Sequence, residues 1–197
     1  MSTHEQTPLA RKDVVAREKE RYGGVKVVCA FFGWLTATGM TVLLTALLAA
    51  LGAGVGLVSS ASEVADAASA RGVSTQDIGW FGAILVIAVV LVAYYSGGYV
   101  AGRMARFDGA RQGAAVFGWA VLTAIVVAVL GAIGGAKFDV LEQLNSFPRL
   151  PGSLSDLSLL AVVVLVGVVV ASLVGAVLGG IAGMHFHRKV DRTGLGR

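Results

Sequence analysis

The amino-acid sequence predicts an all-α integral membrane protein, a bundle of four transmembrane helices. Hydrophobic residues make up 56% of the 197 residues and charged residues only 14%, whereas soluble domains carry about 25% charged residues. Four stretches lack Asp, Glu, Lys and Arg over the roughly 20 residues that a helix needs to cross a bilayer. Because lipid offers the backbone no hydrogen bonds, each stretch is expected to be helical.

The four spans are expected, in chain order, at about residues 27–52, 78–102, 112–136 and 157–184. They divide the chain into a charged tail (1–26), a transmembrane domain (27–186) and a basic tail (187–197). The first apolar stretch is far longer than the roughly 7–15 residues of a signal-peptide core, so we expect it to be retained. A Ser-x-x-Asp capping pattern precedes the second span at Ser74 and the fourth at Ser153.

The orientation of the spans follows from the distribution of Lys and Arg. Thirteen of the 16 basic residues lie in the two tails and in the connection between the second and third spans. The positive-inside rule therefore places both termini in the cytoplasm, and an even number of spans agrees. We interpret residues 9–22 as a solvated, partly helical tail; the alternative is a docking site for a cytoplasmic partner or for anionic lipid.

Small residues recur every four positions in all four spans. Residues four apart share one face of a helix, and a row of small residues lets two backbones approach closely. The expected helix-packing residues are Gly33, Ala37, Gly98, Gly102, Ala124, Ala128, Gly131, Gly135, Gly167, Ala171, Gly175, Gly179 and Gly183. A second row of Ser172, Ala176 and Gly180 runs beside the last of these. The rows pack helices within one bundle or, alternatively, join copies of the chain in a homo-oligomer.

Two short similarities suggest a repeat of two plus two spans. Phe32-Gly33-Trp34 opens the first span and Phe117-Gly118-Trp119 the third, 85 residues later. The glycine-rich ends of the second and fourth spans match at an offset of 82 residues, with Gly97 aligned to Gly179. Both halves begin on the cytoplasmic side, so a repeat would be parallel. The alternative is convergence on the same packing chemistry.

No pattern of residues indicates catalysis, and we expect neither an enzyme nor a cofactor. No Asp, Glu, Lys or Arg lies inside a span, which argues against a proton pump or ion-coupled carrier. His185 and His187 are two apart, point to nearly opposite sides of a helix and would chelate a metal poorly. The single cysteine, Cys29, is expected to be a buried hydrophobe; acylation is the alternative. Basic residues flank the spans rather than forming one patch, so nucleic acid is not expected as a partner.

Two segments resemble a known group of proteins. The segments FFGWLTATG at residues 31–39 and GGYVAGRMAR at residues 97–106 are similar to small, uncharacterised four-helix membrane proteins of high-G+C bacteria, the YrzE-like proteins. The resemblance implies four spans in a bacterial plasma membrane and no particular activity.

The expected function is that of a structural or interaction protein of the membrane. Its expected partners are the lipid bilayer and either another copy of the chain or another membrane protein. The alternative is a passive channel or small-solute transporter, in which Tyr94 and Tyr95 would line a polar path.

Overall fold

The structure is a computed structural model that describes residues 11–54, 72, 75–138, 158–185, 187, 189 and 190. Over these residues it contains five helices and no strand, which confirms the predicted all-α fold. Four of the five helices are long and apolar enough to cross a membrane. The predicted bundle of four transmembrane helices is therefore confirmed at the level of its helices.

The helices follow one another with short connections where the chain is described. They are α1 (Arg11–Tyr22), α2 (Val27–Gly54), α4 (Thr75–Ala105), α5 (Gly109–Phe138) and α7 (Leu159–Gly183). A helix therefore precedes the first span, and only residues 106–108 separate α4 from α5. Arg106 and Asp108 in this turn have positive φ angles of 64° and 54°, which lets the chain reverse within three residues.

Helix α7 begins with a capping serine. The Ser158 hydroxyl accepts a hydrogen bond from the Ala161 amide at 3.2 Å, which satisfies one of the first amides of the helix. The expected capping residues Ser74, Ser153 and Asp156 lie outside the described residues. Another serine thus provides the N-terminal cap of the last span.

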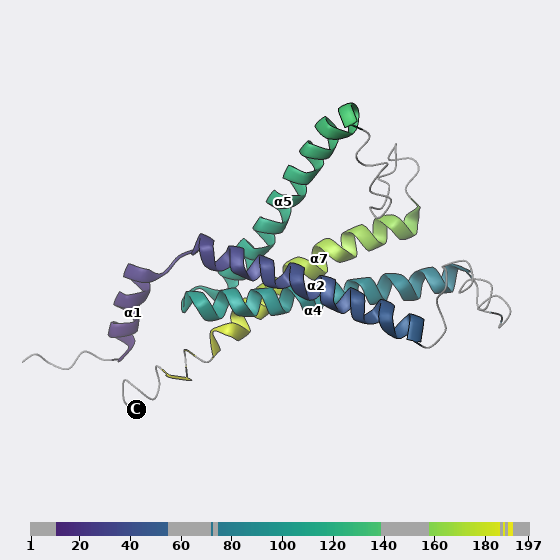
Figure 1. Ribbon diagram of the computed structural model, residues 1–197. Helices are drawn as coiled ribbons and strands as arrows, with labels where there is room; N and C mark the ends of the chain where they lie inside the picture. Colours follow the sequence, from purple (N-terminus) through teal and green to yellow (C-terminus); the bar gives the residue numbers. More distant parts are fainter. Residues whose placement is uncertain are drawn as a thin grey trace, which may run out of the picture.

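The helices cross near one end of the bundle (Figure 1). Helices α2, α4 and α7 lie together, whereas α5 contacts them near its N-terminus and then runs away from them (Figure 1). The centre of the crossing contains Ala30, Ala101, Val116 and Ala176, all with no exposed surface. Three of these four side chains are single methyl groups, so the core consists of closely approaching backbones rather than large side chains.

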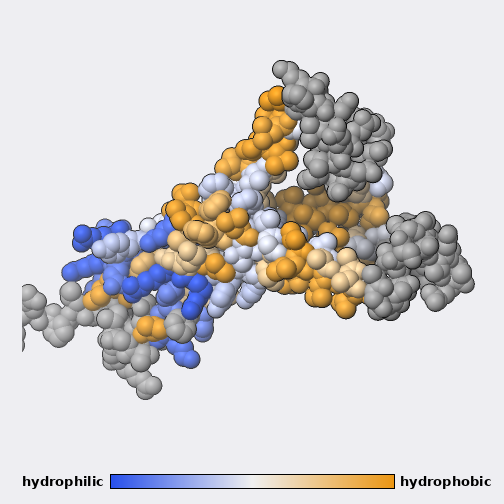
Figure 2. Space-filling model, in the orientation of Figure 1, coloured by the Kyte–Doolittle hydropathy of each residue, from blue (hydrophilic) through white to orange (hydrophobic). Residues whose placement is uncertain are grey.

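Hydrophilic residues gather at the end of the molecule that carries α1 (Figure 2). We call this the basic end; it comprises the described residues within 11–26, 103–112 and 184–190. Exposed apolar side chains cover the four long helices instead, as expected where the surrounding solvent is lipid.

Candidate functional site

The most extensive helix packing joins α4 to α7. A Cβ atom built on Gly175 would lie 2.6 Å from the carbonyl oxygen of Leu91, closer than real Cβ atoms approach any atom. Gly179 and Gly183 lie in the same way against the carbonyl oxygens of Tyr95 and Tyr99. The row predicted on the fourth span thus faces the second span of the same chain.

The contact between α4 and α7 is reciprocal. Gly98 and Gly102 of α4 lie against the carbonyl oxygens of Ala176 and Gly180 of α7. Gly98 lies against the Ala176 carbonyl, and Gly179 lies against the Tyr95 carbonyl. Gly98 and Gly179 are 81 residues apart, and so are Tyr95 and Ala176, so the two contacts are equivalent. The two parallel helices are therefore related locally by a twofold arrangement. Its register is 81 residues, one less than the offset taken from the sequence.

The first and third spans join this pair through small residues of their own. On α2, a Cβ atom on Gly33 would lie 2.7 Å from the Gly97 carbonyl oxygen, and Ala37 packs against Gly97. On α5, Gly109 and Gly113 face the carbonyl oxygens of Gly180 and Ala176. Sequence reasoning missed Gly109 and Gly113, although their spacing of four residues was a usable signal.

The remaining expected packing residues lie in mixed surroundings. Gly167 faces the Ile87 side chain, and Ala171 is buried. Gly131 is half-buried, and the surroundings of Gly135 lie outside the described part. Ala124 and Ala128 are exposed, as is every residue from 121 to 130 of α5 except the half-buried Thr123. Within the single chain these two alanines therefore take no part in the crossing, and the alternative that their row faces another copy stays a prediction.

The two Phe-Gly-Trp segments are not equivalent in their packing. A Cβ atom on Gly33 would clash with α4, whereas nothing lies within 4 Å of the position of a Cβ atom on Gly118. Their tryptophans nevertheless meet, since the Trp34 and Trp119 rings stack with centroids 6.4 Å apart. The reciprocal arrangement of α4 and α7 thus does not extend to the glycines of α2 and α5.

Tyr94 and Tyr95 have different environments. Tyr94 is half-buried and packs against the core that contains Val116 and Ala176. The Tyr95 side chain is exposed, whereas Gly179 packs against the Tyr95 backbone carbonyl. The two hydroxyl groups expected along a polar path therefore belong to side chains in dissimilar settings.

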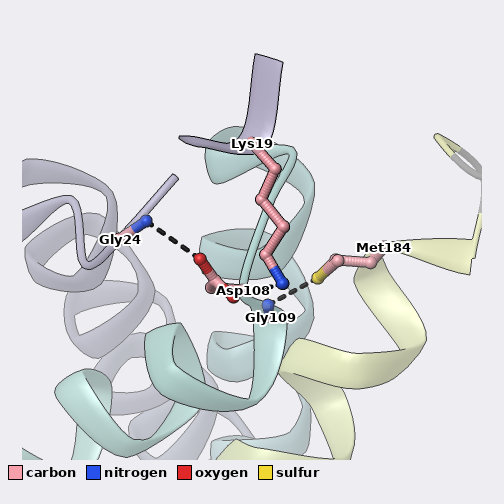
Figure 3. A network of polar contacts seen from close by, with 5 residues as sticks. All are labelled: Lys19, Gly24, Asp108, Gly109 and Met184. Carbon is pink, nitrogen blue, oxygen red and sulfur yellow. Dashed lines mark hydrogen bonds and ion pairs between the residues drawn. The ribbon is translucent and has the colours of Figure 1, made fainter. Parts of the chain in front are cut away.

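A polar cluster at the basic end joins four segments of the chain (Figure 3). It consists of Lys19, Gly24, Asp108, Gly109 and Met184. One Asp108 carboxylate oxygen accepts a hydrogen bond from the Gly24 amide at 2.9 Å, and the other lies 3.2 Å from the Lys19 ammonium. The Gly109 amide donates to the Met184 sulfur. Asp108 thus links α1 and the start of α2 to the turn before α5.

The electrostatic consequence is a stabilised Asp108 carboxylate. The hydrogen bond from the Gly24 amide lowers the pKa of Asp108 most, and Lys19 and Arg111 lower it further against the opposing effect of desolvation. Gly24 itself has a φ angle of +93°, a region that favours glycine. This conformation brings its amide toward the carboxylate.

A buried glutamine makes a second link beside this cluster. Gln112 has no exposed surface, and its Oε1 atom accepts from the Lys26 amide at 3.1 Å. Its Nε2 atom donates to the Lys26 carbonyl at 3.2 Å. The Trp119 indole also donates to the Val27 carbonyl at 3.3 Å. Two side chains of α5 therefore bind the backbone where α2 begins.

An ion pair and a histidine complete the basic end. Arg106 lies 3.0 Å from the Glu18 carboxylate, which ties α1 to the turn a second time. His187 Nε2 lies 2.8 Å from the Arg103 carbonyl oxygen. The single cysteine, Cys29, is half-buried. Among the residues that the structure describes, no three His, Cys, Asp or Glu side chains come together as a metal site requires. The contacts at the basic end can hold α1 against the turn before α5 and fix the positions of the charged side chains.

Comparison with known proteins identifies no relative of this chain. No family model, curated protein or solved structure matches the chain significantly.

Proposed function

We propose that this protein is a non-enzymatic structural or interaction protein of a cell membrane, with α1 as its docking element on the cytoplasmic side. The observation that carries the proposal is the attachment of α1 by Asp108. Lys19 and Gly24 bind one carboxylate, and Glu18 binds the neighbouring Arg106. A helix held in place by two ion pairs, with a hydrogen bond at Gly24 just after its end, has a defined surface to present to a partner.

The packing of the spans supports the same proposal. The glycines of α4 pack against the backbone of α7, and those of α7 pack against the backbone of α4, within a single chain. They build the bundle and leave the basic end for recognition. On α1, the half-buried residues are Val14, Val15 and Glu18, whereas Arg17 and Glu20 are exposed.

Site-specific photo-crosslinking in cells tests this proposal. A photoreactive amino acid at Glu20 should give one discrete adduct with a protein partner, and Asp108→Asn should weaken that adduct because α1 is no longer held in place. A photoreactive residue at Val126, exposed on the apolar face of α5, is the matched control. Absence of a discrete adduct from the exposed positions 13, 16 and 20 of α1 would remove the proposal.

The cytoplasmic orientation is part of the proposal and has its own test. The excess of Lys and Arg at the basic end supports it through the positive-inside rule. In a Cys29→Ser background, a membrane-impermeant thiol reagent applied from outside should label Ser69→Cys but not Thr193→Cys. The opposite labelling pattern would invert the topology. A bacterial plasma membrane and kinship with YrzE-like proteins are proposed on the resemblance of residues 31–39 and 97–106 alone.

A second copy of the chain is the other partner proposed. Gly175 and Gly179 lie inside one chain, whereas Ala124 and Ala128 are exposed four residues apart on α5. We therefore assign self-association to this face of α5, where small residues permit close approach. Ala124→Leu with Ala128→Leu should lower the mass in mild detergent, and an unchanged mass would exclude this interface.

A further inference from the structure

The basic end carries more positive than negative charge among its described side chains. The basic residues are Arg17, Lys19, Arg21, Lys26, Arg103, Arg106, Arg111 and Lys189, against four acidic residues, Asp13, Glu18, Glu20 and Asp108. Two of the acidic residues lie in ion pairs within the chain, Glu18 with Arg106 and Asp108 with Lys19. The surface at this end is therefore suited to an anionic partner.

The position of two of these charges, Lys26 and Arg111, at the ends of spans points to lipid. Lys26 directly precedes the first span, and Arg111 lies in the first turn of α5. Gln112 binds the Lys26 backbone, so Lys26 and the start of α5 lie at the same level. Charges at the ends of transmembrane helices lie at the level of the lipid headgroups.

One face of α1 has the chemistry of a headgroup site. Arg17 and Arg21 are four residues apart and exposed, and they border a shallow hollow of about 300 Å³ together with Val14, Glu18 and Tyr22. The Arg21 guanidinium lies 5.7 Å from the centre of the Tyr22 ring. A guanidinium group often binds a phosphate through two parallel N–H···O hydrogen bonds. Tyrosine and valine suit the apolar region below a headgroup.

We propose that Arg17 and Arg21 of α1 bind the phosphate of an anionic phospholipid in the adjoining leaflet, with Lys26 and Arg111 adding to the positive field. The polar cluster around Asp108 positions α1 for this contact. No protein partner is needed, so this lipid site and the docking function proposed above succeed or fail separately.

Two tryptophans near the basic end provide a direct test. The full-length protein carries three tryptophans, and Trp80→Phe leaves Trp34 and Trp119, of which Trp119 donates to the Val27 carbonyl next to Lys26. The Trp80→Phe protein is placed in phosphatidylcholine vesicles that contain brominated phosphatidylglycerol or brominated phosphatidylcholine. Quenching by the anionic lipid should be stronger by about threefold or more at low salt, and the preference should shrink at high salt.

Two charge-matched variants decide whether α1 is responsible. Arg17→Gln with Arg21→Gln should reduce the preference for phosphatidylglycerol to less than half, with an unchanged circular dichroism spectrum. Lys137→Gln with Arg149→Gln removes two positive charges at other positions and should leave the preference intact. Equal quenching by the two lipids in the parent protein, or equal effects of the two variants, would overturn the proposal.

Discussion

Gly179 of α7 lies so close to the backbone carbonyl of Tyr95 in α4 that a methyl group on the glycine would have no room. Gly98 makes the equivalent contact with the carbonyl of Ala176. In lipid, burial of apolar surface does not drive helices together, so such close backbone approaches are the main source of association. They also bring Cα–H groups near carbonyl oxygens, a weak but repeated attraction.

We therefore expect Gly179→Ala to destabilise the bundle. The new methyl group would push α7 away from α4, and overpacking of this kind costs about 1–3 kcal/mol. The free energy of unfolding can be measured by titrating the protein in mild detergent with sodium dodecyl sulfate. Gly98→Ala should give a loss of similar size, because its contact is the counterpart of the first.

Gly118→Ala is the matched control for this experiment. Nothing lies within 4 Å of the added Cβ atom, and alanine favours the helix over glycine by about 1 kcal/mol. The control should be neutral or slightly stabilising. A loss equal to that of Gly179→Ala would show that helix packing at Gly179 is not the cause.

The attachment of α1 should depend on pH only in strongly acidic solution. The Gly24 amide and Lys19 lower the pKa of Asp108 in the folded chain. The contact therefore stabilises the position of α1 at every pH above the usual carboxyl range, about 4, and is lost as the pH falls through the lowered pKa. A spin label at Glu20→Cys, in a Cys29→Ser background, should stay immobilised from pH 8 to pH 5.

Asp108→Asn provides the comparison for the pH experiment. The amide cannot pair with the Lys19 ammonium as the carboxylate does, so the label should be mobile at neutral pH as well. Release of α1 near pH 6 in the parent protein would contradict the assignment to Asp108 and would implicate a histidine instead.

Gln112→Leu should destabilise the junction between α2 and α5. Both amide atoms of this buried side chain bond to the Lys26 backbone, and their removal leaves the Lys26 amide without that partner at a cost of about 1–3 kcal/mol. Arg111→Leu alters the exposed neighbour and should change the free energy of unfolding by less than about 0.5 kcal/mol. Equal losses in the detergent titration would rule out a special role for Gln112.

Solute flux should not exceed that of empty liposomes if the protein is an interaction protein rather than a channel. Tyr94 packs against the core and Tyr95 is exposed, an arrangement in which the two hydroxyls do not share one path. Release of a trapped fluorescent solute from proteoliposomes measures this directly. Flux that is lost on Tyr94→Phe with Tyr95→Phe would support the channel over the proposed function.

Much of the fold was predictable because its determinants are local. A stretch without charge from Leu157 onward predicts a helix whatever surrounds it, and α7 begins at Leu159. The row of glycines at positions 175, 179 and 183 likewise predicts a face for close packing. Which helix meets that face depends on tertiary structure, so the pairing with Tyr95 and Tyr99 was not predictable from spacing.

The polar cluster was not predictable for the same reason. Asp108 and Gly24 are 84 residues apart, and Gln112 and Lys26 are 86 apart. In the sequence, Gln112 is only the first uncharged residue of an apolar stretch, and Asp108 is one charge in a short connection. The alanines of α5 show the opposite case, since Ala124 and Ala128 fit the pattern of small residues but lie in a stretch of α5 that is almost entirely exposed.

The central place of α7 has a consequence for biogenesis. Because this helix is synthesised after the other three spans, Leu91, Tyr95 and Tyr99 enter the bilayer before the glycines that pack against their backbones have been made. Three inserted spans would therefore form an incomplete intermediate, held chiefly by the junction of α2 with α4 and α5. A premature stop before residue 158 should leave a chain that quality-control proteases recognise and degrade.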